Sequence, residues 1–316
     1  MRSVVVAFTL AGMLSASAGA HAQATSITIL TGAHSGVYYP LGVALSQIYT
    51  KAIPNAKATA QVTKTPAESL NLLQAGRGDL AFTMGDVLSD AWKGAEEAGF
   101  RTPLYKLRGV SATYNNYIQI VARADSGIRT VADLKGKRVS VGTPRSGTDL
   151  NARAILRAAG LGYKELAKVE YLPFGQTAEL MKDRQLDATL QSARLGAASI
   201  SDLATALKIV VVPIPADVVA KVGDAAYQPA MIPANTYQGQ ATDVPTAAIP
   251  NFLVTQSDVS DEIAYLMTKS LYDNLDTLSA AHSAAKTIKR EDALVGMPVP
   301  LHPGAERYYR EIGVIK

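Results

Sequence analysis

The segment VSVGTPRSGTDLNARAILRAAG, residues 139–160, contains a glycine loop of a kind that binds anions. A short apolar run leads into a loop with Gly142 and Gly147, and an Ala- and Leu-rich helical pattern follows. A nucleotide-binding P-loop has the same glycine spacing, but it continues with Lys and then Ser or Thr. Here Thr148 and Asp149 occupy those two positions, so the lysine that reaches nucleotide phosphates is absent.

A second loop of this type, TGAHSGVYYP at residues 31–40, also lies between an expected strand and an expected helix. The first N–H groups of a helix lack partners within the helix, and the positive end of the helix dipole adds to their attraction for anions. Ordinary turns between strands and helices also favour Gly, Ser and Thr, so either loop alone fits a plain turn. Two such loops, one in each expected domain, favour an anion site between the domains.

The sequence contains no common motif for nucleophilic catalysis, zinc binding or dinucleotide binding. The string GAHSG places His34, and not Ser, at the centre of what would be a G-x-S-x-G nucleophile elbow. No H-E-x-x-H or G-x-G-x-x-G string is present. The missing motifs leave metal binding unsupported, and no motif indicates an enzyme, although catalytic groups dispersed along the chain would leave no motif.

Composition and charge narrow the class of protein further. The formal net charge is +4, the basic residues are spread along the chain, and no basic run is interleaved with aromatic residues, so nucleic acid is not expected as a partner. The chain has no Cys, which excludes disulfides and thiolate chemistry. Residues 1–22 have the pattern of a cleaved signal peptide: Arg2, an apolar run of about eleven residues, and an Ala-His-Ala triplet ending at Ala22. We expect a periplasmic protein, with cleavage after Ala24 as the alternative.

Expected strands and helices alternate along most of the chain, which favours largely parallel sheets covered by helices. Extended crossings are expected near residues 115–122 and 236–254. We therefore predict an α/β fold of two domains, the first formed by residues 25–115 with 245–316 and the second by residues 116–244. Ligands of such sheets lie beyond the carboxyl ends of the strands, which places the predicted site in the cleft between the domains.

Three segments together resemble one known family. They are ILTGAHSGVYYPLGVAL, DLKGKRVSVGTPRSGT and PLHPGAERYYREIG, and the similarity includes GDLAFTMGDVLSDAWKG and DVPTAAIPNFLVTQSDVSDEIAY. In this order and spacing they are similar to the TAXI solute receptors, which are the extracytoplasmic subunits of one class of tripartite ATP-independent periplasmic (TRAP) transporters. The resemblance covers essentially the whole chain after the signal peptide.

The resemblance implies a type II periplasmic-binding-protein fold with two hinge strands and a cleft that closes on a solute. It implies no catalysis and no cofactor. The expected ligand is a small organic acid or acidic amino acid, similar to glutamate or 2-oxoglutarate. The expected partner is the integral-membrane TRAP permease, which is driven by an ion gradient, and we expect the receptor itself to be a monomer.

The resemblance also transfers ligand-binding positions from both glycine loops. They are Ser35, Gly36, Val37 and Tyr38 in the first loop and Thr143, Ser146, Gly147 and Thr148 in the second. Two positions depart from the family pattern, because Arg145 stands where Gly is usual and Pro66-Ala67-Glu68 replaces Gly-Gly-Ser. Arg145 either adds a fork for a second carboxylate or is a solvated loop residue. Glu68 could place a negative charge near the cleft.

Further candidates come from the expected ends of strands. Asn115 starts the first crossing strand, and Gln191 and Arg194 follow the strand DATL. Asp86 either meets a ligand amine or caps a helix, and Tyr38 either walls the cleft or packs between elements. Two other functions remain open: a sensing subunit of a membrane signalling system on the same fold, and an exported enzyme.

Overall fold

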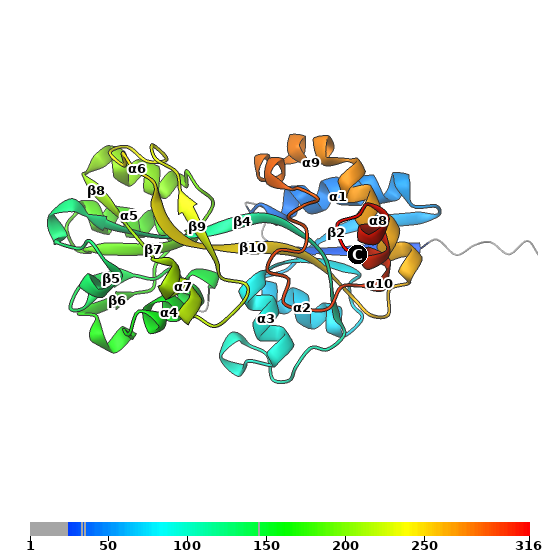
Figure 1. Cartoon of the computed structure of the whole chain (residues 1–316), viewed down its shortest axis with the longest axis horizontal. Helices are drawn as coiled ribbons and strands as arrows, with labels where there is room; N and C mark the ends of the chain where they lie inside the picture. Colours follow the sequence, from blue (N-terminus) through cyan, green and yellow to red (C-terminus); the bar gives the residue numbers. More distant parts are fainter. Residues whose placement is uncertain (1–24, 33, 35, 145) are drawn as a thin grey trace, which may run out of the picture.

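Two α/β lobes lie side by side and are joined by two long strands, as the computed structural model of residues 25–32, 34, 36–144 and 146–316 shows (Figure 1). The joining strands are β4 (Leu107–Arg123) and β10 (Val244–Gln256). This arrangement confirms the predicted fold class. The domain boundaries at residues 115/116 and 244/245 remain predictions, and the expected signal peptide lies outside the described residues.

Lobe 1 is built around three parallel strands near the N-terminus, with the C-terminal helices packed against them. The strands are β1 (Thr25–Thr31), β2 (Ala56–Val62) and β3 (Leu80–Met84). The helices are α1 (Tyr38–Ala52), α2 (Pro66–Gln74), α3 (Gly85–Lys93), α8 (Asp261–Asp273), α9 (Leu275–Ala281) and α10 (Pro303–Glu311). In Figure 1, α1 and α9 lie on one side of the strands and α2 and α3 on the other.

Lobe 2 contains the middle of the chain. Its strands are β5 (Arg138–Ser140), β6 (Lys168–Glu170), β7 (Ala188–Ala193), β8 (Ile209–Val212) and β9 (Gln228–Ile232). Its helices are α4 (Gly147–Ala158), α5 (Phe174–Lys182), α6 (Ala198–Ala206) and α7 (Ala216–Lys221). The sequence pattern did not predict α7, which is a short helix between β8 and β9.

One continuous sheet runs through both lobes in the order β2-β1-β3-β10-β4-β7-β5-β6, with β8 beside β4 and β9 beside β10. The strands β1, β2 and β3 are parallel to one another, as are β5, β6 and β7, whereas β4 and β10 pair antiparallel with each other and with the other strands beside them. Consequently, the carboxyl ends of the parallel strands in each lobe point toward the other lobe. This is where the sequence placed the ligand site.

The two lobes share an apolar core on the side of α3 and α4. Met84 and Val87 of lobe 1 belong to the same buried cluster as Val141, Ala152 and other residues of lobe 2. A second cluster lies within lobe 1, between the sheet and the helices α1, α8 and α10. The lobes are therefore packed against each other on one side of the crossing strands.

The start of α2 shows how one departure from the family pattern is used. Thr65 caps the helix by accepting the Glu68 N–H at 3.1 Å, and Pro66 follows at the first helical position. The Glu68 carboxylate accepts the Lys64 N–H at 2.6 Å. Glu68 thus makes a local hydrogen bond to the residue before the N-cap at the start of α2.

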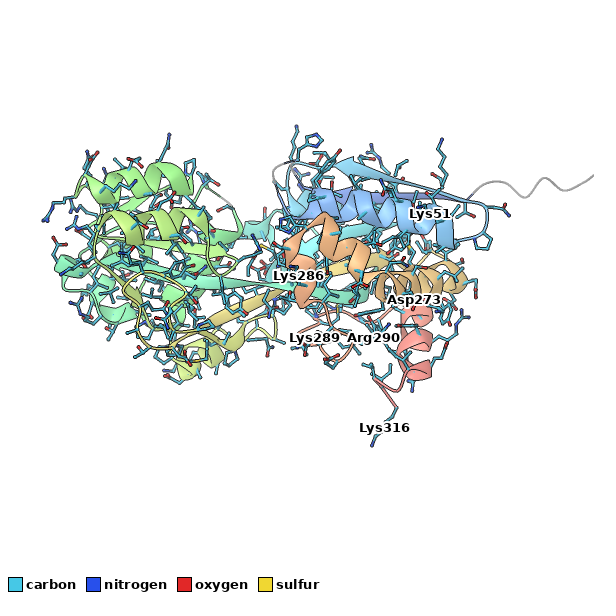
Figure 2. The ribbon with its side chains drawn as sticks, turned by 90° about the horizontal axis from the view of Figure 1, so that it is seen from above. Lys51, Asp273, Lys286, Lys289, Arg290 and Lys316 are labelled. Atoms are coloured by element: carbon cyan, nitrogen blue, oxygen red, sulfur yellow. The ribbon has the colours of Figure 1, made fainter. Side chains whose placement is uncertain are left out.

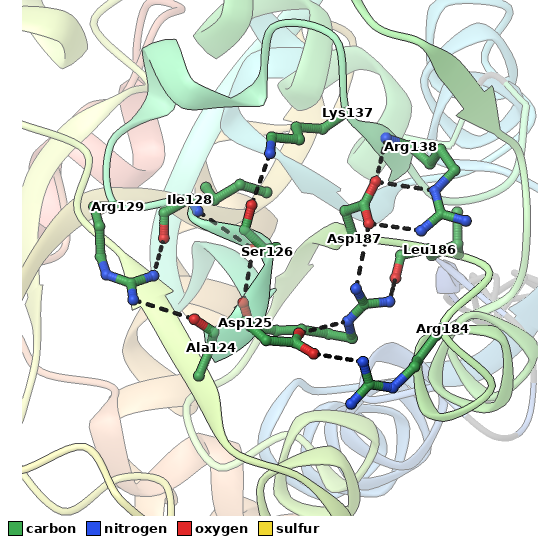
Figure 3. Close-up of polar contacts among 11 residues, drawn as sticks. Ala124, Asp125, Ser126, Ile128, Arg129, Lys137, Arg138, Arg184, Leu186 and Asp187 are labelled. Carbon is green, nitrogen blue, oxygen red and sulfur yellow. Dashed lines mark hydrogen bonds and ion pairs between the residues drawn. The ribbon is translucent and has the colours of Figure 1, made fainter.

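Asp187 holds the far ends of the lobe 2 strands together (Figure 3). Its carboxylate accepts hydrogen bonds from the backbone N–H of Arg138 at 2.9 Å and from that residue's guanidinium at 2.7 and 3.0 Å, and it lies 3.5 Å from the guanidinium of Arg123 at the end of β4. These hydrogen bonds lower the pKa of Asp187. The crossing strand β4 is thereby fixed to β5 and β7 at the end that lies away from the lobe junction.

We expect Gly304→Ala to destabilise the packing of α10 on α8. A Cβ at residue 304 would lie 2.1 Å from the carbonyl oxygen of Asp261 and 2.7 Å from the backbone nitrogen of Tyr265, and both are backbone atoms that cannot simply rotate away. Overpacking of this kind costs roughly 1–3 kcal/mol. Urea unfolding of Gly304→Ala should therefore show a lower midpoint than the wild type.

The matched control is Gly175→Ala, because Gly175 is an exposed helical glycine in α5 with no atom within 4 Å of its would-be Cβ. This variant should be neutral or more stable by about 0.5–1 kcal/mol, since alanine favours the helix. Equal midpoints for the two variants would contradict the close α8–α10 contact.

Candidate functional site

The first glycine loop is attached to a crossing strand through Tyr38. The tyrosine hydroxyl donates a hydrogen bond to the Asn251 side chain on β10, and the ring stacks on Phe82 with a centroid separation of 5.1 Å. Asn251 in turn donates to the carbonyl oxygen of Tyr114 on β4 at 3.0 Å. Tyr38 therefore packs between elements, which was one of its two interpretations. Gly36 is exposed, and Val37 immediately precedes α1.

The second glycine loop is shaped by its own residues. Gly142 has a φ of 82°, and a Cβ there would lie 2.7 Å from the Cβ of Thr148, so the turn requires glycine. The Ser146 hydroxyl accepts the Asp149 N–H at 3.2 Å and so caps α4. Thr143 is exposed, and its carbonyl oxygen accepts the Ser146 N–H at 3.1 Å.

Thr148 lies at the lobe 2 side of the junction. Its side chain is buried, and Oγ1 accepts the backbone N–H of Ser192, the next-to-last residue of β7, at 3.3 Å. Because a hydroxyl carries a donor as well as acceptors, this contact leaves Thr148 chemically able to donate a hydrogen bond. Two further residues predicted for these loops, Ser35 and Arg145, lie outside the described residues.

The two lobes are in contact where α3 and α4 begin. A Cβ on Gly147 would lie 2.8 Å from the Sδ of Met84, so the absence of a side chain at residue 147 lets the lobes come together. Four residues further along α4, Asn151 donates to the Asp86 carboxylate at 2.5 Å and to the Tyr227 hydroxyl at 3.0 Å.

These contacts form a continuous chain of polar groups across the junction. The Ser192 hydroxyl donates to Asn151 Oδ1 at 2.6 Å, and Ser192 is also the residue whose N–H Thr148 accepts. Asp86 also accepts its neighbour's N–H, from Val87, at 2.9 Å. Asp86 thus accepts a hydrogen bond from Asn151 of lobe 2. The sequence offered two roles for Asp86, a ligand contact or a helix cap, and neither included this contact.

Burial of the Asp86 carboxyl raises its pKa to about 7. The hydrogen bonds from Val87 and Asn151 act in the opposite direction, and the carboxylates of Asp90 and Asp224 raise the pKa further. Burial likewise raises the pKa of Asp90 to about 6. A carboxyl that titrates near neutral pH therefore lies at the contact between the lobes.

Gln191 and Asn115 have different surroundings from the glycine loops. Gln191 is fully buried and accepts the Ser199 hydroxyl of α6 at 2.6 Å, while its Nε2 has no hydrogen-bond partner among the described residues. Asn115 is exposed on β4 and lines a cavity. Arg194 follows β7, lines the same cavity, and donates to the Ser283 hydroxyl of lobe 1 at 3.4 Å.

This cavity has a volume of about 440 Å³ and lies over the crossing strands, with walls from both lobes. Its charged lining residues are Arg194, Lys289 and Asp292. The described residues of the two glycine loops are not part of its lining. Sequence reasoning missed the 283–295 wall because that stretch carries no motif and is brought to the crossing strands only by the fold.

The chain is similar to known proteins both in sequence and in fold. A model described as the NMT1-like family matches residues 29–313. Among solved structures, the protein XAC2383 from Xanthomonas citri bound to ATP is similar, with a TM-score of 0.58 and 11% identity, covering 92% of this chain and 97% of that chain. PhnD1 from Prochlorococcus marinus, in complex with methylphosphonate, gives a TM-score of 0.54 and 12% identity over 93% and 100% of the two chains.

A TctC solute-binding protein from Polaromonas is also similar, with a TM-score of 0.52 and 15% identity over 92% of this chain and 99% of that one. At these identities the likeness establishes the fold, which is that of the two-domain periplasmic solute-binding proteins. Within the described part of the chain, no helix combines the length and the apolar character that crossing a membrane requires.

Asp86 should make the stability of the protein depend on pH. In the unfolded chain this carboxyl titrates near pH 4, as an ordinary Asp does. Because its pKa in the folded protein is about 7, the folded state binds more protons than the unfolded state between these values. The free energy of unfolding should therefore fall as pH rises from about 4 to about 7, by up to about 1.4 kcal/mol per pH unit from this group.

Urea unfolding of Asp86→Asn across this pH range should show a flatter dependence than the wild type. Asp258→Asn serves as the control, because Asp258 is exposed and its hydrogen bond from Lys106 lowers its pKa. Removal of that carboxyl should leave the fall in stability between pH 4 and pH 7 in place. A wild type whose stability rises steadily over this range, with Asp86→Asn parallel to it, would refute the shifted titration.

Proposed function

The chain belongs to this NMT1-like family, and we propose that it is a periplasmic receptor that binds a small organic anion reversibly between its two lobes. The fold supports this proposal, because two lobes joined by two strands can close on a solute. Two of the similar proteins hold anions in this fold, methylphosphonate in one and ATP in the other. We further propose that the receptor changes nothing in its solute and performs no catalysis.

The observation that carries the proposal is the position of the start of α4. Gly147 meets Met84 of lobe 1, and Thr148 contacts the end region of β7, so this helix start lies at the junction of the lobes. The N–H groups of its first turn and the positive end of its dipole favour an anion there. The absence of a P-loop lysine favours a carboxylate over the phosphate chain of a nucleotide.

The proposed solute is a small carboxylate similar to glutamate or 2-oxoglutarate. Hydrogen bonds to a charged group contribute about 1.5–3 kcal/mol each, so two or three from the Thr148 hydroxyl and nearby N–H groups are enough to hold one carboxylate. Following the resemblance to the TAXI receptors, we propose that the loaded protein delivers this solute to an ion-gradient-driven TRAP permease. The first loop, with Gly36 and Val37, would contribute from lobe 1.

Thr148→Ala should weaken binding of such a solute by roughly ten- to a hundredfold, because about 1.4 kcal/mol corresponds to each factor of ten. The measurement is titration calorimetry with glutamate and with 2-oxoglutarate. Thr148→Ser is the matched control, since it keeps the hydroxyl that accepts the Ser192 N–H. It should bind within a fewfold of the wild type.

A neutral analogue separates the role of the carboxylate from general effects. Replacing the bound carboxylate by an amide should cost the wild type more than it costs Thr148→Ala, and the difference is the coupling energy between the two groups. Full binding by Thr148→Ala, or strictly additive losses, would remove Thr148 from the solute site. A wild type whose melting temperature no organic acid or amino acid raises would contradict the receptor function itself.

A further inference from the structure

The cavity over the crossing strands does not include the start of α4 in its lining. Residues of β4 and β10 form its floor, including Tyr114 and Asn115. Arg194 and Leu195 of lobe 2 line it, and the 283–295 stretch of lobe 1 supplies another wall. Its volume of about 440 Å³ lies within the range of sites for small ligands.

Basic side chains reach this cavity from both lobes. Arg194 comes from the end of β7, and Lys289 comes from the stretch after α9, on which Figure 2 labels it together with Lys286. One acidic residue, Asp292, also lines the cavity, so its formal lining charge is +1. An anion is therefore favoured over a cation.

Arg194 has the geometry of an anchor. Among the described residues its guanidinium has one hydrogen-bond acceptor, the Ser283 hydroxyl at 3.4 Å, which is a long contact for this kind of bond. A guanidinium carries five N–H donors in a planar fork that matches a carboxylate. Arg194 also acts on a neighbouring group: burial raises the pKa of Tyr114, and the positive charge of Arg194 opposes that rise.

Neutral hydrogen-bonding groups complete the lining. Asn115 is exposed on the crossing strand, and Ser283 and Thr287 carry hydroxyl groups on the lobe 1 side. A guanidinium fork, a nearby ammonium and neutral donors form the set that recognises a small carboxylate. The 283–295 stretch and β7 are far apart in sequence, so this set exists only in the folded protein.

We infer that this cavity is a second anion site, in which Arg194 binds the carboxylate of a small organic anion. The described residues of the glycine loops do not line it, so it is distinct from the proposed solute site at the start of α4. Both lobes form its walls, so an anion here contacts lobe 1 and lobe 2 at once. Where the proposed function holds, occupancy of this site biases the position of the lobes and is linked to solute affinity in both directions.

The probe for the experiment is malonate, a small dicarboxylate, added at constant ionic strength. The chain has no Cys, so Asn115→Cys provides a single attachment point for an environment-sensitive fluorophore on the cavity wall. Malonate should change the fluorescence of this labelled protein in a saturable way. Calorimetry on the unlabelled protein supplies the dissociation constant.

Three variants locate the bound malonate. Arg194→Ala should weaken malonate binding at least tenfold, and Arg194→Lys should give an intermediate loss because it keeps the charge without the fork. Thr148→Ala should bind malonate at this site within twofold of the wild type. Lys286→Ala is the control for surface charge, since Lys286 is exposed on the same stretch and is not part of the cavity lining.

Each other outcome overturns the second site. Equal losses in Arg194→Ala and Thr148→Ala would mean that the cavity and the start of α4 form one site. A loss in Thr148→Ala alone would place the malonate in the solute site, and equal losses in Arg194→Ala and Lys286→Ala would indicate unspecific attraction. An unchanged signal at millimolar malonate in the wild type refutes the site even when glutamate or 2-oxoglutarate binds normally. Unchanged melting temperatures of the variants exclude loss of the fold as the cause.

Discussion

The antiparallel pairing of β4 with β10 is the constraint on which the rest of the structure depends. The paired register extends from Tyr117 and Ala248 to Leu107 and Gln256, with irregularities between Pro250 and Phe252 and between Leu253 and Val254. In lobe 1 this ribbon continues through β10 to β3, and in lobe 2 it continues through β4 to β7. The two halves of the sheet therefore extend from opposite edges of one two-stranded ribbon. Because β3 pairs antiparallel with β10 and β7 pairs antiparallel with β4, the carboxyl ends of both sets of parallel strands point toward the junction.

The junction between the lobes combines a few specific hydrogen bonds with a larger buried apolar surface. Asp86, Asn151 and Ser192 form a hydrogen-bonded chain between the lobes, while Met84 and its neighbours bury apolar surface around it. Burial disfavours the charged form of a carboxyl group, and this raises the pKa of Asp86 to about 7. Lys93 and Ser89 of α3 also reach across to Asp224, at 2.9 and 2.6 Å. Separating the lobes on this side would expose groups that are now paired, so the closed arrangement of this face is specific as well as compact.

Most of the fold could be predicted from the sequence because its signals are local. Glycine, proline and capping residues mark the starts of helices such as α2, and apolar runs mark β1 and β3. The candidate site was harder to predict from the sequence, for two physical reasons. Asn151 donates hydrogen bonds to Asp86 and Tyr227, which are far from it in the sequence, and no spacing rule connects residues 86, 151 and 227. The sequence left Tyr38 with two interpretations and named Gln191 as a ligand candidate. In the folded protein Tyr38 bonds to a crossing strand and Gln191 to α6, and packing makes these contacts without any signal in the sequence spacing.

The same ribbon creates two unlike environments for an anion. At the start of α4 the donors are backbone N–H groups and a hydroxyl, whose positions are fixed by the helix and by the Gly142 turn. At the cavity the donor is the side chain of Arg194, which is long, exposed and held by one long contact to Ser283. Backbone donors lose little entropy when they bind, whereas ordering an arginine costs side-chain freedom that its charge must offset. The start of α4 is therefore suited to selecting one solute by geometry. The cavity is suited to an anion that binds more weakly and mainly affects the relative position of the two lobes.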